Sequence, residues 1–212
     1  MKIFVVRHGK TNANANNFLA GNSNFAQLNE EGLKHAENLA INFKKEDIDA
    51  VFVSPLDRAM HTAKPLLETK NLQPIQDKRL VEFDFGDIDN KPREGEVLEL
   101  WAKSKKDLMF QFPNGESHLE LIERTKGFIE ELKEKNLNKV MIVAHGITNK
   151  TIISHLLEVD LNKAENVSLI HQPNSVVYEI DTLTKECNWL DTLTKKKGEG
   201  VLYLEKYGLL KS

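Results

Sequence analysis

The sequence predicts an α/β fold, a three-layer sandwich with a mostly parallel central sheet and a short lid insertion. Apolar, β-branched runs of strand length recur along the chain, at residues 3–6, 51–53, 140–144 and 175–180. Stretches with helical spacing of apolar residues lie between or after these runs. Strands that alternate with helices favour a parallel sheet whose two faces are covered by the connecting helices.

Length and composition narrow the class of protein. The 212 residues suit one domain, 1–212, with the lid at about residues 91–116, because no linker rich in Pro, Gly or Ser divides the chain. A hydrophobic content of 40% is enough for a sizeable core. The net charge of −3, with both signs interspersed, argues against a nucleic-acid partner. The single cysteine, Cys187, excludes an internal disulfide and a zinc site built of thiolates.

Hydropathy gives no sign of a membrane partner. No stretch approaches the ~20 apolar residues that span a bilayer. The first apolar run, at residues 3–6, is too short for the core of a signal peptide. We therefore expect a cytoplasmic protein. The sequence leaves a homodimer open.

The helix predicted after residue 29 has a clear start. Asn29 can cap it, and the acids at positions 30 and 31 suit the positive end of the helix dipole. One face is expected to be buried, because apolar residues recur there at 3–4 spacing: Leu33, Ala36, Leu39, Ala40 and Phe43. His35 falls on the other face and is expected to lie in solvent.

Two further helices are predicted from their first turns. Ser54 can cap a helix that Pro55 begins, because proline suits the first helical position. Ser117 and Glu120 form a capping box. The helix that follows this box is expected to bury a stripe of apolar residues: Leu119, Ile122, Ile129 and Leu132.

The C-terminal third predicts one more helix and short strands. Residues 147–158 are expected to be helical, with His155 on the surface. The similar segments 181–185 and 191–195 are expected to be two similar turns rather than a repeat architecture. Residues 201–204 are expected to add an edge strand.

The first candidate for chemistry follows the strand at residues 3–6. Arg7, His8 and Gly9 place a cation, an imidazole and a flexible backbone where the strand ends. Open α/β sheets bind their ligands at the carboxyl ends of the strands. Arg7 can capture an anion that His8 attacks, while Gly9 lets the backbone approach a ligand closely. A helix start with an incidental surface histidine is the alternative interpretation.

Two other strand ends carry side chains that suit the same chemistry. Residues 51–53 lead into Ser54-Pro55-x-x-Arg58, and residues 140–144 lead into His145-Gly146. We therefore expect Arg58 and His145 at the same edge of the sheet as His8.

Acidic and amide side chains between these strands leave alternatives open. Three acids lie close together, at Glu82, Asp84 and Asp87, and residue chemistry alone does not separate a catalytic carboxylate from solvated or capping ones. The asparagine-rich loop at 12–24 can line a site or remain a solvated loop.

Taken together, these segments resemble the motifs of the histidine phosphatase superfamily, the phosphoglycerate-mutase-like enzymes, and in particular its phosphatase branch. The matching segments are, in chain order, Arg7-His8-Gly9-x-Thr11-x-x-Asn14, Ser54-Pro55-x-x-Arg58-Ala59-x-x-Thr62-Ala63, Leu80-x-Glu82-x-x-x-Gly86, Gly115-Glu116-Ser117 and Ala144-His145-Gly146. The resemblance spans residues 3 to about 180, and it selects Glu82 among the three acids.

The resemblance implies a role for each matched residue. The catalytic set comprises a nucleophile, two phosphate-binding arginines, a further hydrogen-bond donor and a proton donor, which are respectively His8, Arg7 and Arg58, His145, and Glu82. The substrate-binding residues are Asn14, Gly21 and Gly146. No cofactor and no metal is expected, because the arginines supply positive charge and no His/Asp spacing resembles a metal cage.

The predicted function is a metal-independent phosphatase that hydrolyses a small phosphomonoester through a phosphohistidine intermediate. A cofactor-dependent phosphoglycerate mutase and a non-catalytic phosphate- or phosphoprotein-binding module are the alternatives. The interval from Glu82 to His145 leaves room for one short lid, in which Arg93 stands without an adjacent arginine, and this favours the phosphatase. Lys10 occupies a position where the family often has an acid or glutamine, and it is left outside the site.

Overall fold

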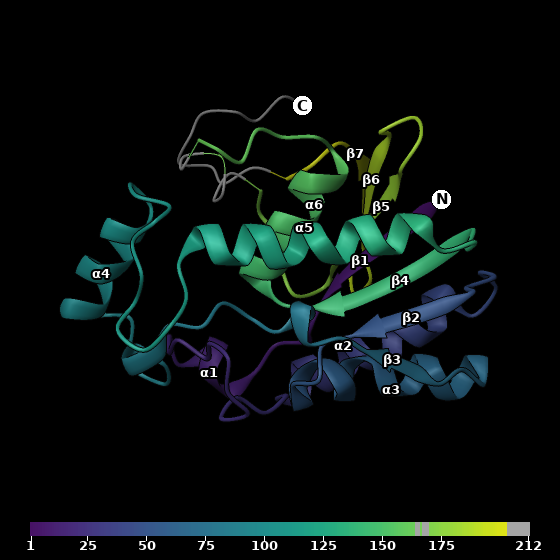
Figure 1. Cartoon of the computed structure of the whole chain (residues 1–212). Helices are drawn as coiled ribbons and strands as arrows, with labels where there is room; N and C mark the ends of the chain where they lie inside the picture. The colour runs from purple at the N-terminus through teal and green to yellow at the C-terminus, as the bar shows by residue number, and fades with distance from the viewer. Residues whose placement is uncertain (164–165, 167–169, 203–212) are drawn as a thin grey trace.

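The computed structural model describes residues 1–163, 166 and 170–202, and these residues form a seven-stranded sheet flanked by helices (Figure 1). The strands are β1 (Lys2–Arg7), β2 (Ala50–Val53), β3 (Pro74–Gln76), β4 (Lys139–Ala144), β5 (Val176–Asp181), β6 (Cys187–Asp191) and β7 (Lys197–Glu199). The α-helices are α1 (Asn12–Ala15), α2 (Glu30–Phe43), α3 (Asp57–Lys70), α4 (Glu96–Ser104), α5 (His118–Glu134) and α6 (Gly146–Leu156). Two short 3₁₀ helices lie at Lys78–Leu80 and Gly86–Ile88.

The sheet has the order β3-β2-β4-β1-β5-β6-β7. The half from β3 to β1 is parallel, and β5, β6 and β7 extend it with antiparallel pairs. Arg7 of β1 pairs with Ala144 of β4, and Val53 of β2 pairs with Val143. The residues that follow β1, β2 and β4 therefore emerge together at one edge of the sheet.

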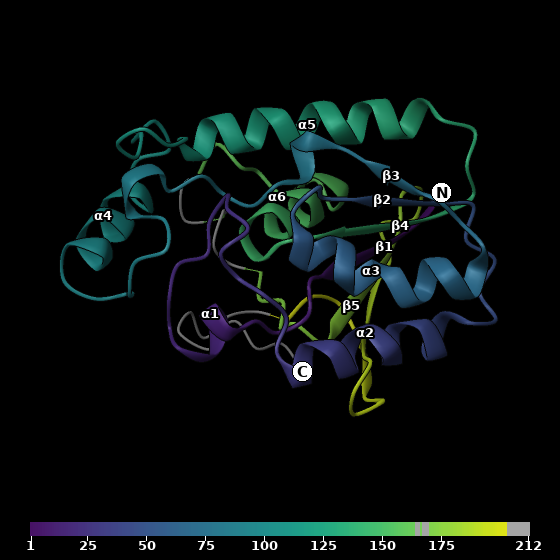
Figure 2. The ribbon, with the colours of Figure 1, turned by 90° about the horizontal axis from the view of Figure 1, so that it is seen from below.

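Helices cover both faces of the sheet, which confirms the predicted three-layer α/β sandwich. Figure 2 shows α5 on one side of the strands and α2 with α3 on the other. Side chains of α5 and α6 form one buried cluster with the sheet, and side chains of α2 and α3 form a second cluster with its opposite face.

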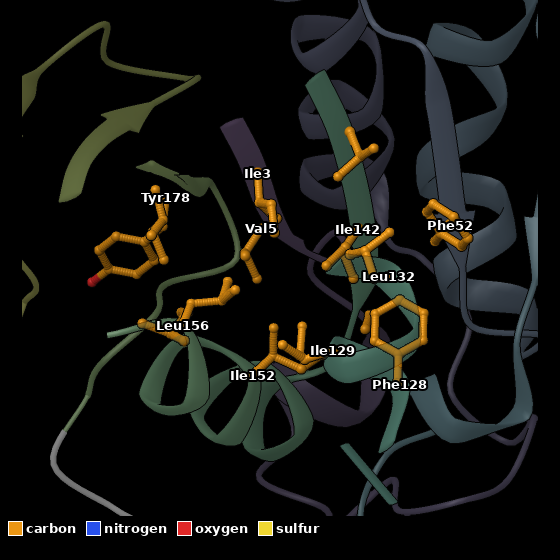
Figure 3. Close-up of a cluster of buried hydrophobic side chains, with 14 of the residues drawn as sticks. Ile3, Val5, Phe52, Phe128, Ile129, Leu132, Ile142, Ile152, Leu156 and Tyr178 are labelled. Carbon is orange, nitrogen blue, oxygen red and sulfur yellow. The ribbon is translucent and has the colours of Figure 1, made fainter. Parts of the chain in front are cut away.

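The alternation of side chains along β1 explains its uninterrupted apolar sequence. Ile3 and Val5 lie on the face of the sheet toward Ile152 and Leu156 of α6, in the cluster shared with α5 (Figure 3). The residues between them on the chain enter the core formed with α2 and α3. Because both faces of the strand are buried, every position in its centre is apolar. Each such side chain contributes about 1.5–3 kcal/mol through burial.

Two of the predicted helix starts are confirmed. The side chain of Asn29 accepts a hydrogen bond from the backbone N–H of Gly32, 2.9 Å away, at the start of α2. Ser117 and Glu120 form the reciprocal capping box before α5, with the Glu120 carboxylate 2.7 Å from the Ser117 backbone nitrogen.

The predicted start of α3 is wrong. The helix begins at Asp57 after Leu56, without a side-chain cap, and Pro55 lies outside it. The Ser54 hydroxyl accepts a long hydrogen bond from the backbone N–H of Leu56 and binds the His145 ring at 2.7 Å. The Ser54 side chain therefore binds a distant histidine instead of capping the helix that follows it.

Two positions on α2 were assigned to the wrong environment. Leu33 is 52% exposed, whereas His35 is only 1% exposed. The turn at 191–195 lies against this helix, where Asn42 donates a hydrogen bond to the backbone carbonyl of Thr192. The negative charge of Asp191 acts on His35, whose pKa is nevertheless lowered to about 4 by burial. A segment some 150 positions away thus covers the face expected to be in solvent.

Packing between α5 and α6 corrects two further expectations. His155 is half-buried rather than superficial, because its Nε2 lies 3.1 Å from the backbone carbonyl of Ile122. Leu119, expected in the buried stripe of α5, is 39% exposed at the first turn of the helix.

The C-terminal strands differ in part from the prediction. The segments 181–185 and 191–195 do form two similar turns, each with an aspartate that accepts hydrogen bonds from two backbone N–H groups that follow it. The last described strand is β7, earlier than the predicted strand at 201–204. Val201 and Leu202 are not in a strand, and positions 203 and 204 lie outside the described residues.

The segment 91–116 contains a short helix, α4, which lies apart from the helices that cover the sheet (Figure 1). Trp101 of α4 packs against Phe85, with ring centroids 5.4 Å apart, and Phe85 also contacts Phe112. This aromatic cluster attaches the segment to the rest of the chain. None of the helices in the described part of the chain is long and apolar enough to cross a membrane.

Candidate active site

A cavity of about 310 Å³ opens where β1, β2 and β4 end. Seven of the eight predicted site residues line it: Arg7, His8, Asn14, Gly21, Arg58, Glu82 and Gly146. The eighth, His145, is fully buried beside the cavity, with its ring centroid 5.2 Å from that of His8. The structure therefore brings together side chains from opposite ends of the sequence.

His8 is held as a neutral imidazole with one nitrogen free to act. Its Nδ1 lies 2.7 Å from the backbone carbonyl of Gly9, and because a carbonyl only accepts, Nδ1 carries the proton. The lone pair is therefore on Nε2. Burial lowers the pKa of His8 well below its usual 6.5, and the positive charges of Arg58 and Arg7 lower it further. A neutral imidazole with a free lone pair can act as a nucleophile.

Arg58, on the first turn of α3, is only 1% exposed and organises its surroundings. Its Nη2 and Nη1 donate hydrogen bonds to the carbonyls of Gly21 and Ser23, at 2.7 and 2.6 Å. Its Nε donates to Nδ1 of His145 at 3.2 Å. Burial lowers the pKa of Arg58 to about 10, so that the guanidinium remains charged at neutral pH.

Arg7, at the end of β1, keeps part of its hydrogen-bonding capacity unused. Its Nη1 donates to the backbone carbonyl of Gln172 at 2.9 Å, while its buried Nε has no partner among the described residues. A Cβ at Gly146 would lie 3.2 Å from the Arg7 guanidinium, so glycine there leaves room for this side chain. Arg7 lines the cavity, so its guanidinium can bind an anion there.

His145 has both ring nitrogens engaged by protein groups. An arginine only donates, so Nδ1 accepts from Arg58, and Nε2–H donates to the Ser54 hydroxyl at 2.7 Å. Burial and the nearby charge of Arg58 lower the pKa of His145 well below 6.5. In this arrangement Nδ1 of His145 accepts a hydrogen bond and Nε2–H is bound to Ser54. His145 would need a proton on Nδ1 to donate a hydrogen bond to a phosphate. Its role as a donor to the substrate therefore stays a prediction.

Among the three clustered acids, Glu82 is the one that faces the cavity. Its Oε1 accepts from the backbone N–H groups of Phe83, Ile147 and Thr148, at 3.0–3.2 Å. These donors include the first turn of α6, where a carboxylate is stabilised by the helix dipole. Oε2 has one longer contact with the protein, 3.3 Å from the backbone nitrogen of Ile147.

The other two acids have local structural partners. Asp84 accepts a hydrogen bond from the backbone N–H of Gly86 at 2.9 Å. Asp87 accepts from the side-chain amide of Asn114 at 3.0 Å. Of the three acids, Glu82 therefore faces the cavity, whereas Asp84 and Asp87 bind neighbouring groups of the fold.

The predicted substrate-binding residues line the cavity for different reasons. Asn14 uses its side-chain oxygen to accept from the Thr11 backbone N–H, which leaves its amide nitrogen for a ligand. Gly21 has φ 44°, and a Cβ there would overlap the Asp89 carboxylate. Its carbonyl meets Arg58, so this glycine shapes the loop that binds the arginine.

Gly9 has another role than the one expected, whereas Lys10 lies outside the catalytic cavity as expected. A Cβ on Gly9 would lie 2.5 Å from the carbonyl oxygen of Gly32, so Gly9 permits the close approach of α2 rather than of a ligand. Lys10 pairs with Glu31 at 2.7 Å and does not line the catalytic cavity.

Sequence reasoning missed several residues that line or support the cavity. Lys150 lies on α6 four residues after Gly146, a spacing that places both on one face of the helix and that was available as a signal. Gln172 donates its side-chain amide to the carbonyls of Val5 and Val176. It lies in an irregular stretch without periodicity, where the sequence carried no signal.

A neutral buried histidine, two arginines and a carboxylate at the end of a parallel sheet are the side chains expected of an enzyme that acts on phosphate groups. The chain belongs to the histidine phosphatase superfamily (branch 1), whose family model matches residues 3–192. This confirms the family inferred from the motifs.

Individual relatives agree with this assignment. Phosphoserine phosphatase 1 of Hydrogenobacter thermophilus is 30% identical over 184 residues, which cover 84% of this chain and 86% of that protein. A Yersinia pestis protein named "Probable phosphoglycerate mutase GpmB" is 29% identical and covers 74% of this chain and 75% of its own length. The crystal structure of the alpha-ribazole phosphatase from Shigella flexneri superposes with a TM-score of 0.77 at 25% identity, over 96% of both chains. The chain is a phosphoric monoester hydrolase of the histidine phosphatase type.

Proposed function

We propose that this protein hydrolyses a small phosphomonoester without a metal, through a phosphohistidine formed on His8. The observation that carries the proposal is the neutral His8 imidazole, with its Nδ1 proton bound to Gly9 and its Nε2 in a cavity lined by Arg7 and Arg58. The cavity volume of about 310 Å³ is at the lower end of the usual range for ligand sites, which suits a small substrate.

The first half of the reaction uses the groups already placed. Nε2 of His8 attacks phosphorus, and the bond from phosphorus to the ester oxygen breaks. Glu82 gives a proton from Oε2 to the departing oxygen, so that the product leaves as an alcohol. The planar guanidinium of Arg7 hydrogen-bonds the phosphoryl oxygens, and Arg58 stabilises their negative charge from its buried position.

The second half returns the enzyme to its starting state. Glu82, now ionised, takes a proton from water, whose oxygen attacks phosphorus. The bond from phosphorus to Nε2 breaks, its electron pair returns to the imidazole, and inorganic phosphate leaves. The positive charge that a metal would supply comes here from arginine, and α4 with the rest of the segment 91–116 serves as the lid of a single domain.

Detection of the intermediate tests this mechanism. Brief exposure to labelled p-nitrophenyl phosphate, followed by a denaturing quench, should leave label that survives base and is lost in acid. His8→Ala should lose the label and the turnover together. His61→Ala, an exposed histidine on α3, is the matched control and should retain both. Label that persists in His8→Ala would refute the assignment of the nucleophile.

Isomerisation is a second candidate because of the similarity to the Yersinia protein named as a mutase. A mutase must keep its phosphohistidine away from water while the substrate reorients. The short segment 91–116, with Arg93 as its single arginine, supports hydrolysis instead. With 3-phosphoglycerate and a trace of 2,3-bisphosphoglycerate, phosphate should be the main product. Formation of 2-phosphoglycerate that greatly outpaces phosphate release would reverse this choice.

A further inference from the structure

The catalytic cavity contains more positive charge than a phosphate group requires. Arg7 and Arg58 together balance a phosphomonoester, which carries close to two negative charges at neutral pH. Two further cations, Arg93 and Lys150, also line the cavity. Glu82 is the one acid among the described lining residues, and its Oε1 is already hydrogen-bonded to the start of α6.

Lys150 is a half-buried cation on which the charge of Glu82 acts from a distance, without an ion pair between them. Within the described part of the chain, its ammonium group forms neither a hydrogen bond nor an ion pair, and it lies on the cavity wall. Burial, followed by the positive charges of Arg7 and Lys105, lowers the pKa of Lys150 to about 8. An ammonium group partly removed from water and left unpaired is unfavourable unless something compensates it. An anionic ligand would provide that compensation.

Arg93, an exposed residue of the segment 91–116, brings a second positive charge to the wall of the same cavity. Its backbone N–H binds the carbonyl of Asn17, while its side chain has no hydrogen-bond or ion-pair partner among the described residues. Its charge acts on both Arg7 and Lys150, lowering the pKa of each, so the cations share one region of the cavity. Burial also lowers the pKa of Arg93 itself.

The remaining wall is largely apolar. Its uncharged polar residues include His171 and Gln172, and its apolar residues are Leu19, Ala20, Phe85, Val97, Leu98, Trp101 and Ile147. The cavity therefore has three regions that a substrate can contact. These are the phosphate-binding arginines beside His8, the apolar wall, and the two cations Arg93 and Lys150. Apolar groups do not hold an anion, so a second anionic group of the substrate has one place to bind.

We propose that Arg93 and Lys150 form a second anion subsite, and that the substrates of this enzyme are small phosphomonoesters whose alcohol part carries a carboxylate. This inference rests on the proposed phosphatase function. A carboxylate matches the planar guanidinium of Arg93 and the point charge of Lys150, and it adds little volume to a ligand that must fit about 310 Å³.

Matched substrate pairs test the subsite. 3-Phosphoglycerate and glycerol 3-phosphate differ by a carboxylate in place of a hydroxymethyl group, and O-phosphoserine and O-phosphoethanolamine differ by a carboxylate in place of hydrogen. The carboxylated member of each pair should have a kcat/KM about tenfold or more higher, as expected for one charge-assisted hydrogen bond. Equal kcat/KM values within both pairs would overturn the proposal.

Variants of Lys150 show whether this residue causes the preference. Lys150→Met should reduce kcat/KM for the carboxylated substrate at least tenfold more than for its partner, mainly through KM. Lys150→Arg should restore the preference. For the native enzyme KM of the carboxylated substrate should rise as pH passes 8, and for Lys150→Arg it should not. Lys103→Met, an exposed lysine on α4, is the matched control and should keep the native preference. Equal losses on both substrates in Lys150→Met would assign the residue to phosphate binding or folding instead.

Two additional measurements separate the remaining outcomes. Propane-1,3-diol bisphosphate tests a second phosphate, and a preference for it over 3-phosphoglycerate would overturn the choice of a carboxylate. Turnover of p-nitrophenyl phosphate with formation of phosphohistidine, but without a carboxylate preference, would refute the subsite alone. A native enzyme that neither turns over p-nitrophenyl phosphate nor forms a phosphohistidine would refute the proposed function.

Discussion

Replacement of Arg58 by lysine tests whether the geometry of this guanidinium, rather than its charge alone, sustains the site. The three nitrogens of Arg58 bind the carbonyls of Gly21 and Ser23 and the Nδ1 atom of His145. Lysine keeps the positive charge but has one nitrogen on a flexible stem, so it cannot reproduce this planar arrangement.

The expected magnitude follows from the partners that lysine would abandon. One ammonium group can satisfy one or two of the three acceptors, and each buried polar group left unpaired costs about 1–3 kcal/mol. We expect Arg58→Lys to lower the free energy of unfolding by about 2–4 kcal/mol for this reason. In a chain of this size the melting temperature should fall by roughly 5–15 °C. We also expect kcat/KM for p-nitrophenyl phosphate to fall roughly 10²–10³-fold, the usual loss for one preorganised donor to the transition state.

Urea unfolding followed by circular dichroism measures the stability change, and steady-state kinetics measures the catalytic one. Arg79→Lys is the matched control, because Arg79 also bonds two partners, Asp77 and Glu131, but its side chain is 32% exposed. Partly exposed pairs contribute about 0–1 kcal/mol, so the control should change little. An Arg58→Lys variant with native stability and activity would show that positive charge alone is sufficient and would refute the geometric argument.

Three further predictions concern the proton donor, a buried acid and metal dependence. Glu82→Gln should keep the fold, because its amide oxygen still accepts from Phe83 and α6, and should lower turnover ~10²–10⁴-fold. The loss should be smaller for esters with good leaving groups, and equal losses for all esters would exclude the role of proton donor. Burial and the charge of Asp84 raise the pKa of Asp89 from 3.8 to about 7, so the contribution of Asp89 to native stability should decline as pH rises from about 4 through 7. Asp89→Asn should abolish this decline and give a higher urea midpoint than the native protein at pH 8, and parallel pH profiles would contradict the shift. EDTA should not change turnover in metal-free buffer, whereas a loss restored by a divalent ion would contradict the metal-independent mechanism.

The layers of the fold and the place of the site were predictable because both depend on local sequence patterns. β1 is apolar at each central position since both of its faces are buried, and this makes it visible as a strand. Arg7 ends β1, Arg58 lies on the first turn of the helix after β2, and His145 follows β4 directly, so recognising the strands also placed these residues near one another. No comparable periodicity marks the stretch between Leu156 and Val176, which supplies Gln172.

The errors arose where tertiary contacts override a local preference. His35 was assigned to solvent from its helical position, but the turn at 191–195 covers that face of α2. Ser54 before Pro55 has the composition of a helix cap, yet its hydroxyl binds His145 across the sheet edge. Neither contact is visible within a window of neighbouring residues, since each joins segments about 90 or more positions apart.

The structure separates the part of the site that binds phosphate from the part that would choose the substrate. His8 and Arg58 come from motifs fixed by strand ends and can be located from sequence. Lys150 and Arg93 come from a helix face and from the segment 91–116, and neither position has a pattern that requires a cation for folding. Gly146 and Lys150 are four residues apart on α6, so the helix that places a glycine against Arg7 also turns Lys150 toward the same cavity. A change at position 150 can therefore alter which esters bind while the groups around His8 keep their arrangement.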